Sequence, residues 1–368
     1  MPKSNAFIHL TTPGIATLKP YVPGKPLAEL ERELGIRDSI KLASNENPLG
    51  CSEAAKEAIR STLTDVARYP DGGGFELRDA LAKKHRVSAD CVTLGNGSND
   101  ILDMIARVFL YPGRESLFSQ YAFAVYPIST QAVGATIRMA TASQYGHDLQ
   151  AMGELVSKDT GVVWIANPNN PTGTRLRTDE LRTFIESLSK SIIVVVDEAY
   201  AEYVDETDHP DASLWLNDFP NLIVTRTFSK AYGLAALRVG YALSHPDVAD
   251  LLNRVRQPFN VNSMAQAAAL AALQDQGFII RSAEANRQGM QQLVDGFQQL
   301  GLDYIPSVGN FIAVDVGRPV EPVDQALLRE GCITRPVANY GMPNHLRVSI
   351  GLEAENARFL LALKKVLG

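Results

Sequence analysis

The sequence contains five short apolar runs that do not alternate with polar residues, and these runs constrain the fold more than any other feature. They are rich in Val and Ile and are bounded by turn residues. The runs cover Val92–Leu94, Gly161–Ala166, Ser191–Asp197, Asn221–Thr225 and Val239–Leu243. Strands that are buried on both faces have this pattern, and such strands are typical of parallel sheets covered by helices.

Segments with helical spacing lie between these runs. Ile101, Ile105 and Phe109 are four residues apart and follow a Ser98-Asn99-Asp100 start that suits a helix cap. Thr178–Leu188 reads as a second helix, with acidic residues in its first turn. The alternation of strands and helices predicts an α/β fold, with a large domain whose mostly parallel central sheet is flanked by helices.

The pattern changes after about residue 245, and the mixed elements that follow predict a smaller α+β domain. They are the helical stretches Ser263–Leu273, Asn286–Leu300 and Glu353–Leu367 and the strand-like pieces Asn310–Val316 and His345–Ile350. Several prolines make the N-terminal segment look like an extended arm. We therefore expect an arm with part of the small domain in 1–44, the large domain in 45–250, and a linker helix with the C-terminal small domain in 251–368.

Composition sets the class of protein without indicating its chemistry. The chain has 368 residues, 45% hydrophobic and 21% charged, as ordinary globular proteins do. Its net charge is −6 and it has no Lys/Arg-rich run, so we expect no nucleic-acid partner. We expect no membrane span, signal peptide, metal site or disulfide framework, and the three separated cysteines favour the cytoplasm.

Polar residues follow four of the apolar runs, where ligands of open α/β sheets bind. Gly95–Asn99 suits a phosphate at a helix start, although it could be a plain turn. Asn167–Gly173 is a rigid turn with amide side chains. Taken singly, an acid at a strand end such as Asp197 is more often a helix cap, and a lysine such as Lys230 is usually a surface lysine. Taken together, a phosphate cup, an amide, an acid and a lysine are what pyridoxal phosphate requires.

Several motifs carry a family resemblance that runs in order from about Leu42 to Gly351. NPNNPTG, VVVDEAY and RTFSKAYGLAALRVGY resemble the fold-type-I pyridoxal-phosphate aminotransferases of class I/II. LASNENPLG, RYPDGGGFELRDALA and LRVSIG are similar to the histidinol-phosphate aminotransferase subfamily. The resemblance implies a pyridoxal 5′-phosphate enzyme, with the large domain binding the cofactor.

The resemblance also implies roles for the catalytic residues. Lys230 would form the internal aldimine and move the proton between the substrate Cα and the cofactor, since its amine exchanges with that of the substrate. Asp197 would pair with the pyridinium nitrogen and so make the ring an electron sink. Asn170 and Tyr200 would donate hydrogen bonds to the phenolic oxygen and lower the aldimine pKa.

Further cofactor contacts follow from the same motifs. Phe123 aligns with a stacking tyrosine of the family, and the neighbouring Tyr121 and Tyr126 are expected to pack in the core. The residues expected to hold the phosphate are Gly97, Ser98, Asn99, Thr227, Ser229 and Arg238.

Substrate contacts are implied by alignment at the two ends of the chain. Arg335 and Arg347 align with arginines that grip the substrate phosphate, and either also suits a carboxylate. Tyr21 and Asn170 would line the substrate, and Tyr69 aligns with a tyrosine that the neighbouring subunit donates. If that holds, the protein is a homodimer with shared active sites. Arg226 and Glu46 lie inside the motifs without an assigned role.

The implied reaction is transamination between histidinol phosphate and 2-oxoglutarate, giving imidazole-acetol phosphate and glutamate in histidine biosynthesis. Alternatives with the same cofactor are a phenylalanine or tyrosine aminotransferase and a threonine-phosphate decarboxylase. A non-enzymatic nucleotide-binding α/β protein is a further alternative, although it would not need the combination of Asn170, Asp197 and Lys230.

Overall fold

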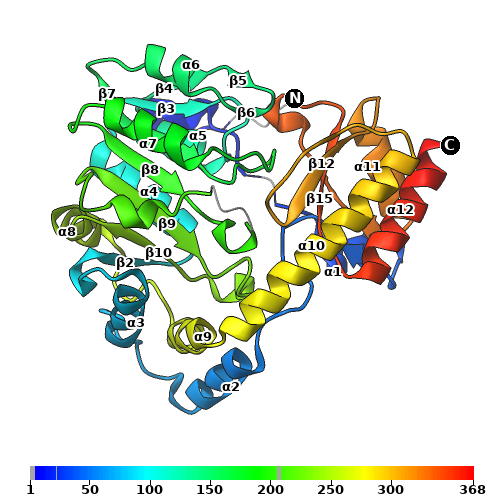
Figure 1. Ribbon diagram of the computed structural model, residues 1–368, viewed down its shortest axis with the longest axis horizontal. Coiled ribbons are helices and arrows are strands. Elements are labelled where there is room, and N and C mark those ends of the chain that lie inside the picture. Colours follow the sequence, from blue (N-terminus) through cyan, green and yellow to red (C-terminus); the bar gives the residue numbers. More distant parts are fainter. Residues whose placement is uncertain (1–4, 22, 205–208) are drawn as a thin grey trace.

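The structure is a computed structural model that describes residues 5–21, 23–204 and 209–368 (Figure 1). In this part of the chain a seven-stranded sheet has the order β2-β10-β9-β8-β7-β3-β4. Its strands are β2 (Val92–Gly95), β3 (Glu115–Ser119), β4 (Thr136–Ala140), β7 (Thr160–Ala166), β8 (Ile193–Asp197), β9 (Leu222–Thr227) and β10 (Gly240–Ser244). All five apolar runs therefore form strands of one sheet, as predicted.

Most neighbours in this sheet are parallel, and β10 is the exception. It pairs antiparallel with both β9 and β2, whereas the β9-β8-β7-β3-β4 neighbours are parallel. The segment between β9 and β10 contains only the short 3-10 helix Ala235–Leu237, so no long helix carries the chain back for a parallel pairing. The sequence patterns missed β3 and β4, because β4 is a largely exposed edge strand and β3 is short and partly polar.

Helices cover both faces of the sheet. Val163 and Val194 belong to one apolar core, while Val162 and Val195 belong to the other, so successive residues of one run point to opposite buried faces. One face is covered by α4 (Ser98–Phe109), α5 (Val125–Ala132) and α8 (Pro246–Val255). The other is covered by α2 (Glu53–Thr62), α3 (Phe75–His85), α6 (Leu149–Glu154), α7 (Thr178–Ser187) and α9 (Ser263–Gln274).

A smaller part of the molecule is built from both chain ends. The long helix α10 (Gln276–Gln299) leads away from the large sheet to a second sheet of order β11-β12-β15-β14 (Figure 1). In the N-terminal region, β1 (Ile40–Lys41) pairs with β13 (Cys332–Ile333). The other elements are α1 (Leu27–Leu34), β11 (Tyr304–Ile305), β12 (Phe311–Asp315), α11 (Val320–Arg329), β14 (Arg335–Pro336), β15 (His345–Ser349) and α12 (Glu353–Leu367).

The fold matches the expected class, a large α/β part with a smaller α+β part. The divisions at residues 44 and 250 remain predictions, and α9 packs with the large sheet before α10 leaves it. The N-terminal arm is not simply extended, because it contains two short 3-10 helices.

A small hairpin is formed by β5 (Ala142–Ser143) and β6 (Gly146–His147). Short 3-10 helices cover Ile8–Leu10, Pro13–Thr17, Leu63–Asp65, Ala89–Cys91, Ala201–Tyr203, Ala212–Trp215 and Ala338–Tyr340.

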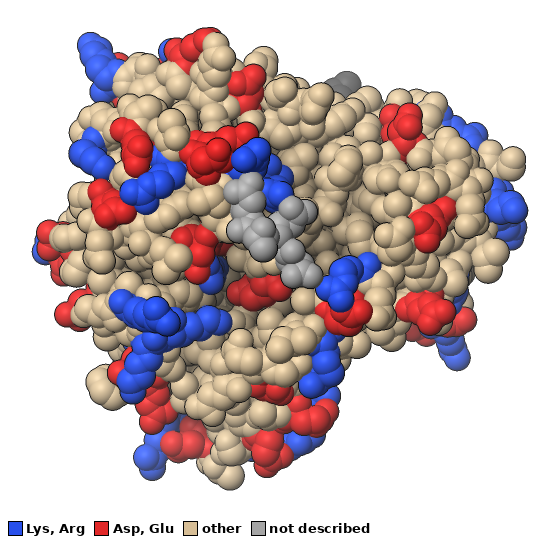
Figure 2. Space-filling view, viewed as in Figure 1, with Lys and Arg blue, Asp and Glu red and all other residues tan. Residues whose placement is uncertain are grey.

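The surface view shows basic and acidic side chains interspersed on the face that it presents (Figure 2). Across the described ranges, the search for a helix long and apolar enough to cross a membrane finds none. The same residues contain no group of three or more His, Cys, Asp or Glu side chains that could hold a metal ion.

Candidate active site

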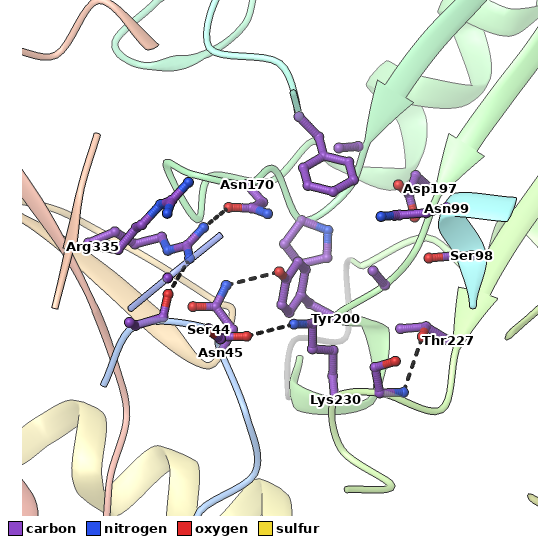
Figure 3. Close-up of a pocket in the computed structure, with 18 of the residues that line it drawn as sticks. Ser44, Asn45, Ser98, Asn99, Asn170, Asp197, Tyr200, Thr227, Lys230 and Arg335 are labelled. Carbon is purple, nitrogen blue, oxygen red and sulfur yellow. Dashed lines mark hydrogen bonds between the residues drawn. The ribbon is translucent and has the colours of Figure 1, made fainter. Parts of the chain in front are cut away.

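A pocket lies where β7, β8 and β9 end, and it gathers side chains from both parts of the molecule (Figure 3). All the side chains predicted for the site line it except Tyr69, and Gly97 precedes the pocket residue Ser98. In Figure 3, Ser98 and Thr227 lie on one side, Arg335 lies on the opposite side, and Lys230 and Tyr200 lie between them. The predicted residues are Tyr21, Ser98, Asn99, Phe123, Asn170, Asp197, Tyr200, Thr227, Ser229, Lys230, Arg238, Arg335 and Arg347.

Asp197 ends β8 inside the pocket, and the residue is only 5% exposed. Burial raises its pKa above the ordinary value, while hydrogen bonds from neighbouring hydroxyls oppose that change. Tyr126 donates to Oδ2 over 2.9 Å and Thr225 donates to Oδ1 over 3.0 Å. The carboxylate is therefore held in one orientation by two neutral donors, which suits it to face a cationic ring nitrogen in the pocket.

The role of Tyr126 was only half anticipated. Its ring is buried and stacks on Trp164 at 5.1 Å between centroids, which agrees with the expected core packing. Its hydroxyl, however, contacts Asp197 and so belongs to the site. Helix α5 places it there, 71 positions earlier in the chain than the acid. No local pattern could show this contact, because only the packing of α5 on the sheet creates it.

Lys230 lies in the loop after β9, and its Nζ donates to the backbone oxygen of Ser44 over 3.0 Å. Burial, together with the nearby charge of Arg347, lowers the pKa of the Lys230 amine to about 7. A large fraction of this amine is neutral near pH 7, and only the neutral form is a nucleophile. The amine also lies 5.6 Å from the centre of the Tyr200 ring, within the same pocket.

The phosphate end of the site is formed by the start of α4 and the loop after β9. Gly97, with a φ of +81°, occupies the N-cap position, and no side chain caps the helix, contrary to the cap expected from the Ser98-Asn99-Asp100 start. Arg238 donates to Ser229 Oγ over 3.2 Å, and a Cβ at Gly97 would collide with its guanidinium group. Free helix N–H groups beside an arginine and hydroxyls fit a phosphate.

Asn170 and Arg347 are joined directly across the pocket. Arg347 Nη1 donates to Asn170 Oδ1 over 2.6 Å, and Nη2 donates to the backbone oxygen of Ala43 over 2.8 Å. Because Oδ1 is used in this way, Nδ2 is the atom of Asn170 that remains to donate toward a ligand. The pair therefore links the Asn-Pro turn of the large part to β15 of the small part.

Arg335, the second predicted substrate arginine, lies beside Arg347 on the neighbouring strand. Arg335 in β14 is the register partner of Arg347 in β15, and both side chains are less than one-tenth exposed. The guanidinium of Arg335 lies 5.6 Å from the centre of the Tyr21 ring, so the N-terminal arm reaches this end of the pocket. The cross-strand pair concentrates positive charge where the expected substrate phosphate would bind.

Tyr69 lies outside the pocket of its own chain. Its side chain is 82% exposed and stacks on Phe259 at 4.7 Å between ring centres. This placement leaves Tyr69 available to another chain, and its predicted role in a neighbouring site remains a prediction.

Two motif residues without an assigned role take part in ion pairs. Arg226 makes a buried contact to Glu198 Oε2 at 2.6 Å and a partly buried contact to Asp211 Oδ1 at 2.8 Å. These contacts tie β9 to the residue that follows β8 and to the loop beyond it. Glu46 pairs with Lys41 at 2.8 Å on the surface. Arg226 is thus a structural cation beside the site rather than a pocket residue.

Sequence reasoning also missed the N-terminal wall of the pocket, formed by Gly24, Ala43, Ser44 and Asn45. The motif LASNENPLG contains three of them, and it was used only for the family resemblance. The motif alone could not show that these residues line the pocket, because they do so through contacts with distant segments of the chain.

Comparison with known proteins agrees with this geometry. The family model "Aminotransferase class I and II" matches residues 37–363. Histidinol-phosphate aminotransferase 2 of Pseudomonas fluorescens is 59% identical over 99% of each chain, and that of Pseudomonas aeruginosa is 60% identical over 98% of each. The crystal structure of histidinol-phosphate aminotransferase from Sinorhizobium meliloti in complex with pyridoxal-5′-phosphate is 29% identical, with a TM-score of 0.89 over 97% of each chain.

The fold is shared with an aspartate aminotransferase double mutant from Thermus thermophilus, which is 22% identical. Its TM-score is 0.84, over 96% of this chain and 98% of that one. The site and the fold therefore define a fold-type-I aminotransferase, a class of pyridoxal-phosphate enzymes. The chain belongs to the class I and II aminotransferases and, within them, to the histidinol-phosphate aminotransferase family. The family resemblance expected from the motifs is confirmed.

Proposed function

We propose that this chain transfers the amino group of L-histidinol phosphate to 2-oxoglutarate, giving imidazole-acetol phosphate and glutamate in histidine biosynthesis. The observation that carries the proposal is the cross-strand pair Arg335 and Arg347, which faces the pocket that holds Lys230 and Asp197. Two buried guanidinium groups supply the charge that a phosphate dianion needs. The names of the bacterial relatives at 59–60% identity support the same substrate.

Pyridoxal phosphate fits the side chains of the pocket. The uncapped start of α4 with Arg238 suits its phosphate, and the buried carboxylate of Asp197 suits its ring nitrogen. When bound, the cofactor supplies a reactive carbonyl carbon and a ring that accepts electrons from the substrate. The proposed phosphate contacts are Gly97, Ser98, Asn99, Thr227, Ser229 and Arg238, and Phe123 covers one face of the ring.

The remaining proposed roles concern protons. Lys230 supplies the amine that joins protein and cofactor, and it then moves the proton of the substrate Cα. Asp197 holds a proton on the ring nitrogen, because a carboxylate facing a cationic nitrogen stabilises the charged form. Asn170 Nδ2 and the Tyr200 hydroxyl donate to the phenolic oxygen, while Arg347 orients Asn170 through their hydrogen bond.

At the substrate end, Arg335 and Arg347 bind the phosphate of histidinol phosphate, and the same groups bind the carboxylates of glutamate in the second half-reaction. One site serves both substrates in turn. Tyr21 and Asn170 line the space between this end and the cofactor.

We further infer a homodimer in the cytoplasm. Exposed apolar side chains cluster in one N-terminal segment, which supports a partner surface there: Leu63, Val66, Tyr69 and Phe75 are 53–82% exposed. In such a dimer Tyr69 would reach the site of the other subunit. The three free cysteines are compatible with a reducing compartment.

Rapid mixing of the yellow holoenzyme with histidinol phosphate, phenylalanine or threonine phosphate tests the proposal. We expect histidinol phosphate to bleach the visible band fastest, without release of carbon dioxide. Faster bleaching by phenylalanine would indicate an aromatic aminotransferase instead. Carbon dioxide released from threonine phosphate would indicate a decarboxylase.

A further inference from the structure

Asn45 is a buried residue of the N-terminal segment whose contacts reach three distant parts of the chain. It is 1% exposed and adopts a left-handed backbone conformation with a φ of +55°. Asparagine is among the few residues other than glycine that enter this region readily. The backbone is therefore shaped so that one amide side chain points at the active site (Figure 3).

We propose that Asn45 is a positioning residue that directs the hydroxyl proton of Tyr200 into the pocket. Asn45 Nδ2 donates to Tyr200 Oη over 3.0 Å. The Tyr200 oxygen thus accepts a hydrogen bond from the protein, and its own proton remains available for a ligand. The inference rests on the proposed function, in which Tyr200 donates to the phenolic oxygen of the cofactor.

The orientation of the Asn45 amide follows from its other neighbour. The backbone N–H of Asn45 donates to Ser349 Oγ over 2.8 Å, and Ser349 Oγ in turn donates to Asn45 Oδ1 over 3.1 Å. With Oδ1 occupied by this hydroxyl, the amide nitrogen faces Tyr200. In the reverse orientation the Tyr200 hydroxyl would donate its proton to Asn45 Oδ1 and could no longer donate to a ligand.

The small part of the molecule holds this arrangement in place. Asn310 donates to the backbone oxygen of Asn45 over 2.9 Å, and Phe311 packs edge-on against the Tyr200 ring at 5.1 Å. Ser349 lies on β15 two residues after Arg347, so both side chains leave the same face of that strand. The strand that places the substrate arginine therefore also sets the direction of the cofactor donor.

Tyr200 is protonated when this contact operates. Burial raises its pKa to about 12, although the charge of Arg347 and the Asn45 hydrogen bond oppose the rise. Near neutral pH the residue is thus a hydrogen-bond donor, and Asn45 decides where it donates.

The test is a double-mutant cycle between Asn45→Gly and Tyr200→Phe. The measured quantity is the pH midpoint at which the aldimine of the holoenzyme loses its proton, followed by the visible absorbance band. Glycine keeps the left-handed backbone and removes the whole amide side chain. A hydrogen bond to a charged oxygen lowers the titration midpoint by about one to two pH units. We expect each single substitution to raise the midpoint by about that amount, and the double variant to rise no further.

Asn45→Asp provides a second variant of equal size that replaces the donor by an acceptor. It should raise the midpoint at least as much as Asn45→Gly, with a smaller effect in the Tyr200→Phe background. The control is Tyr203→Phe, which removes a buried hydroxyl that contacts Asn310 and not Asn45. Its midpoint should equal that of the wild type.

Two results would overturn the inference. One is an unchanged midpoint in both Asn45 variants while Tyr200→Phe shifts it. The other is an Asn45 shift that is equally large in the Tyr200→Phe background. If Tyr200→Phe itself leaves the midpoint unchanged, the proposed role of Tyr200 fails, and the inference fails with it. The substrate assignment is tested separately by the mixing experiment.

Discussion

The hydroxyl of Tyr126 donates to Oδ2 of Asp197 over 2.9 Å, while the ring of the same tyrosine stacks on Trp164 in the core. The carboxylate proposed to face the ring nitrogen of the cofactor is thus anchored to the packing of helix α5 on the sheet. Its orientation depends on a side chain that does not line the pocket.

Tyr126→Phe should keep the fold and impair catalysis, since only the hydroxyl is lost. The hydrogen bond lowers the pKa of Asp197, so its removal should raise that pKa and move the acid limb of the kcat–pH profile to higher pH. We expect kcat near neutral pH to fall by roughly tenfold, since the free energy of one hydrogen bond to a charged group corresponds to a rate change of about that size. Tyr121→Phe is the matched control, and an equal loss in both variants would contradict this prediction.

Lys230→Met should stabilise the cofactor-free protein at neutral pH. The amine has a pKa of about 7 in the folded state against an ordinary value of 10.5, so the unfolded chain binds more protons between these values. The wild type is therefore destabilised most below pH 7, and the penalty disappears as pH approaches 10.5. Urea unfolding should show a gain on the order of 4 kcal/mol at pH 7 that shrinks with rising pH. A gain that does not depend on pH would exclude this explanation.

Arg335→Ala should weaken the binding of histidinol phosphate more than that of phenylalanine. Loss of a charged hydrogen bond to a phosphate corresponds to a KM increase of about 10- to 100-fold. Arg335→Lys retains the charge but lacks the planar fork, and it should recover part of the loss. Steady-state kinetics with both amino donors provides the measurement, and equal KM changes would argue against a phosphate contact.

Arg226→Met should destabilise the protein strongly, because it leaves Glu198 buried without its cation. Such losses are typically about 3–5 kcal/mol. Burial already raises the pKa of Glu198 to about 7, so the carboxyl of the variant should take up a proton. Combining the change with Glu198→Gln should recover much of the stability in urea titrations. No recovery in the double variant would show that the ion pair is not the cause.

Mixing Lys230→Ala with Tyr69→Ala should generate activity if sites are shared across a homodimer. Each variant alone is expected to be weak or inactive, whereas a mixed dimer would contain one site with both native residues. The assay is transaminase activity after subunit exchange, which differently tagged chains can verify. Complete exchange without recovered activity would remove Tyr69 from the neighbouring site.

Much of the site could be predicted because its residues follow strands. Asp197 ends β8 and Lys230 follows β9, and the carboxyl ends of adjacent parallel strands necessarily lie close together. The apolar runs identified these strands, since both of their faces are buried. The antiparallel direction of β10 was not predicted, because an apolar run has no direction of pairing.

The sequence by itself determined five of the seven strands of the large sheet, the order of the chemical groups at its edge, and the cofactor that such groups suit. Local pattern carries this information, because burial and turn chemistry act on neighbouring residues. Only the tertiary structure decided that Tyr126 orients Asp197 and that Asn45 meets Tyr200 and Ser349, partners 155 and 304 positions away. These contacts depend on how helices and sheets pack, and packing brings together residues whose separation along the chain has no regular period.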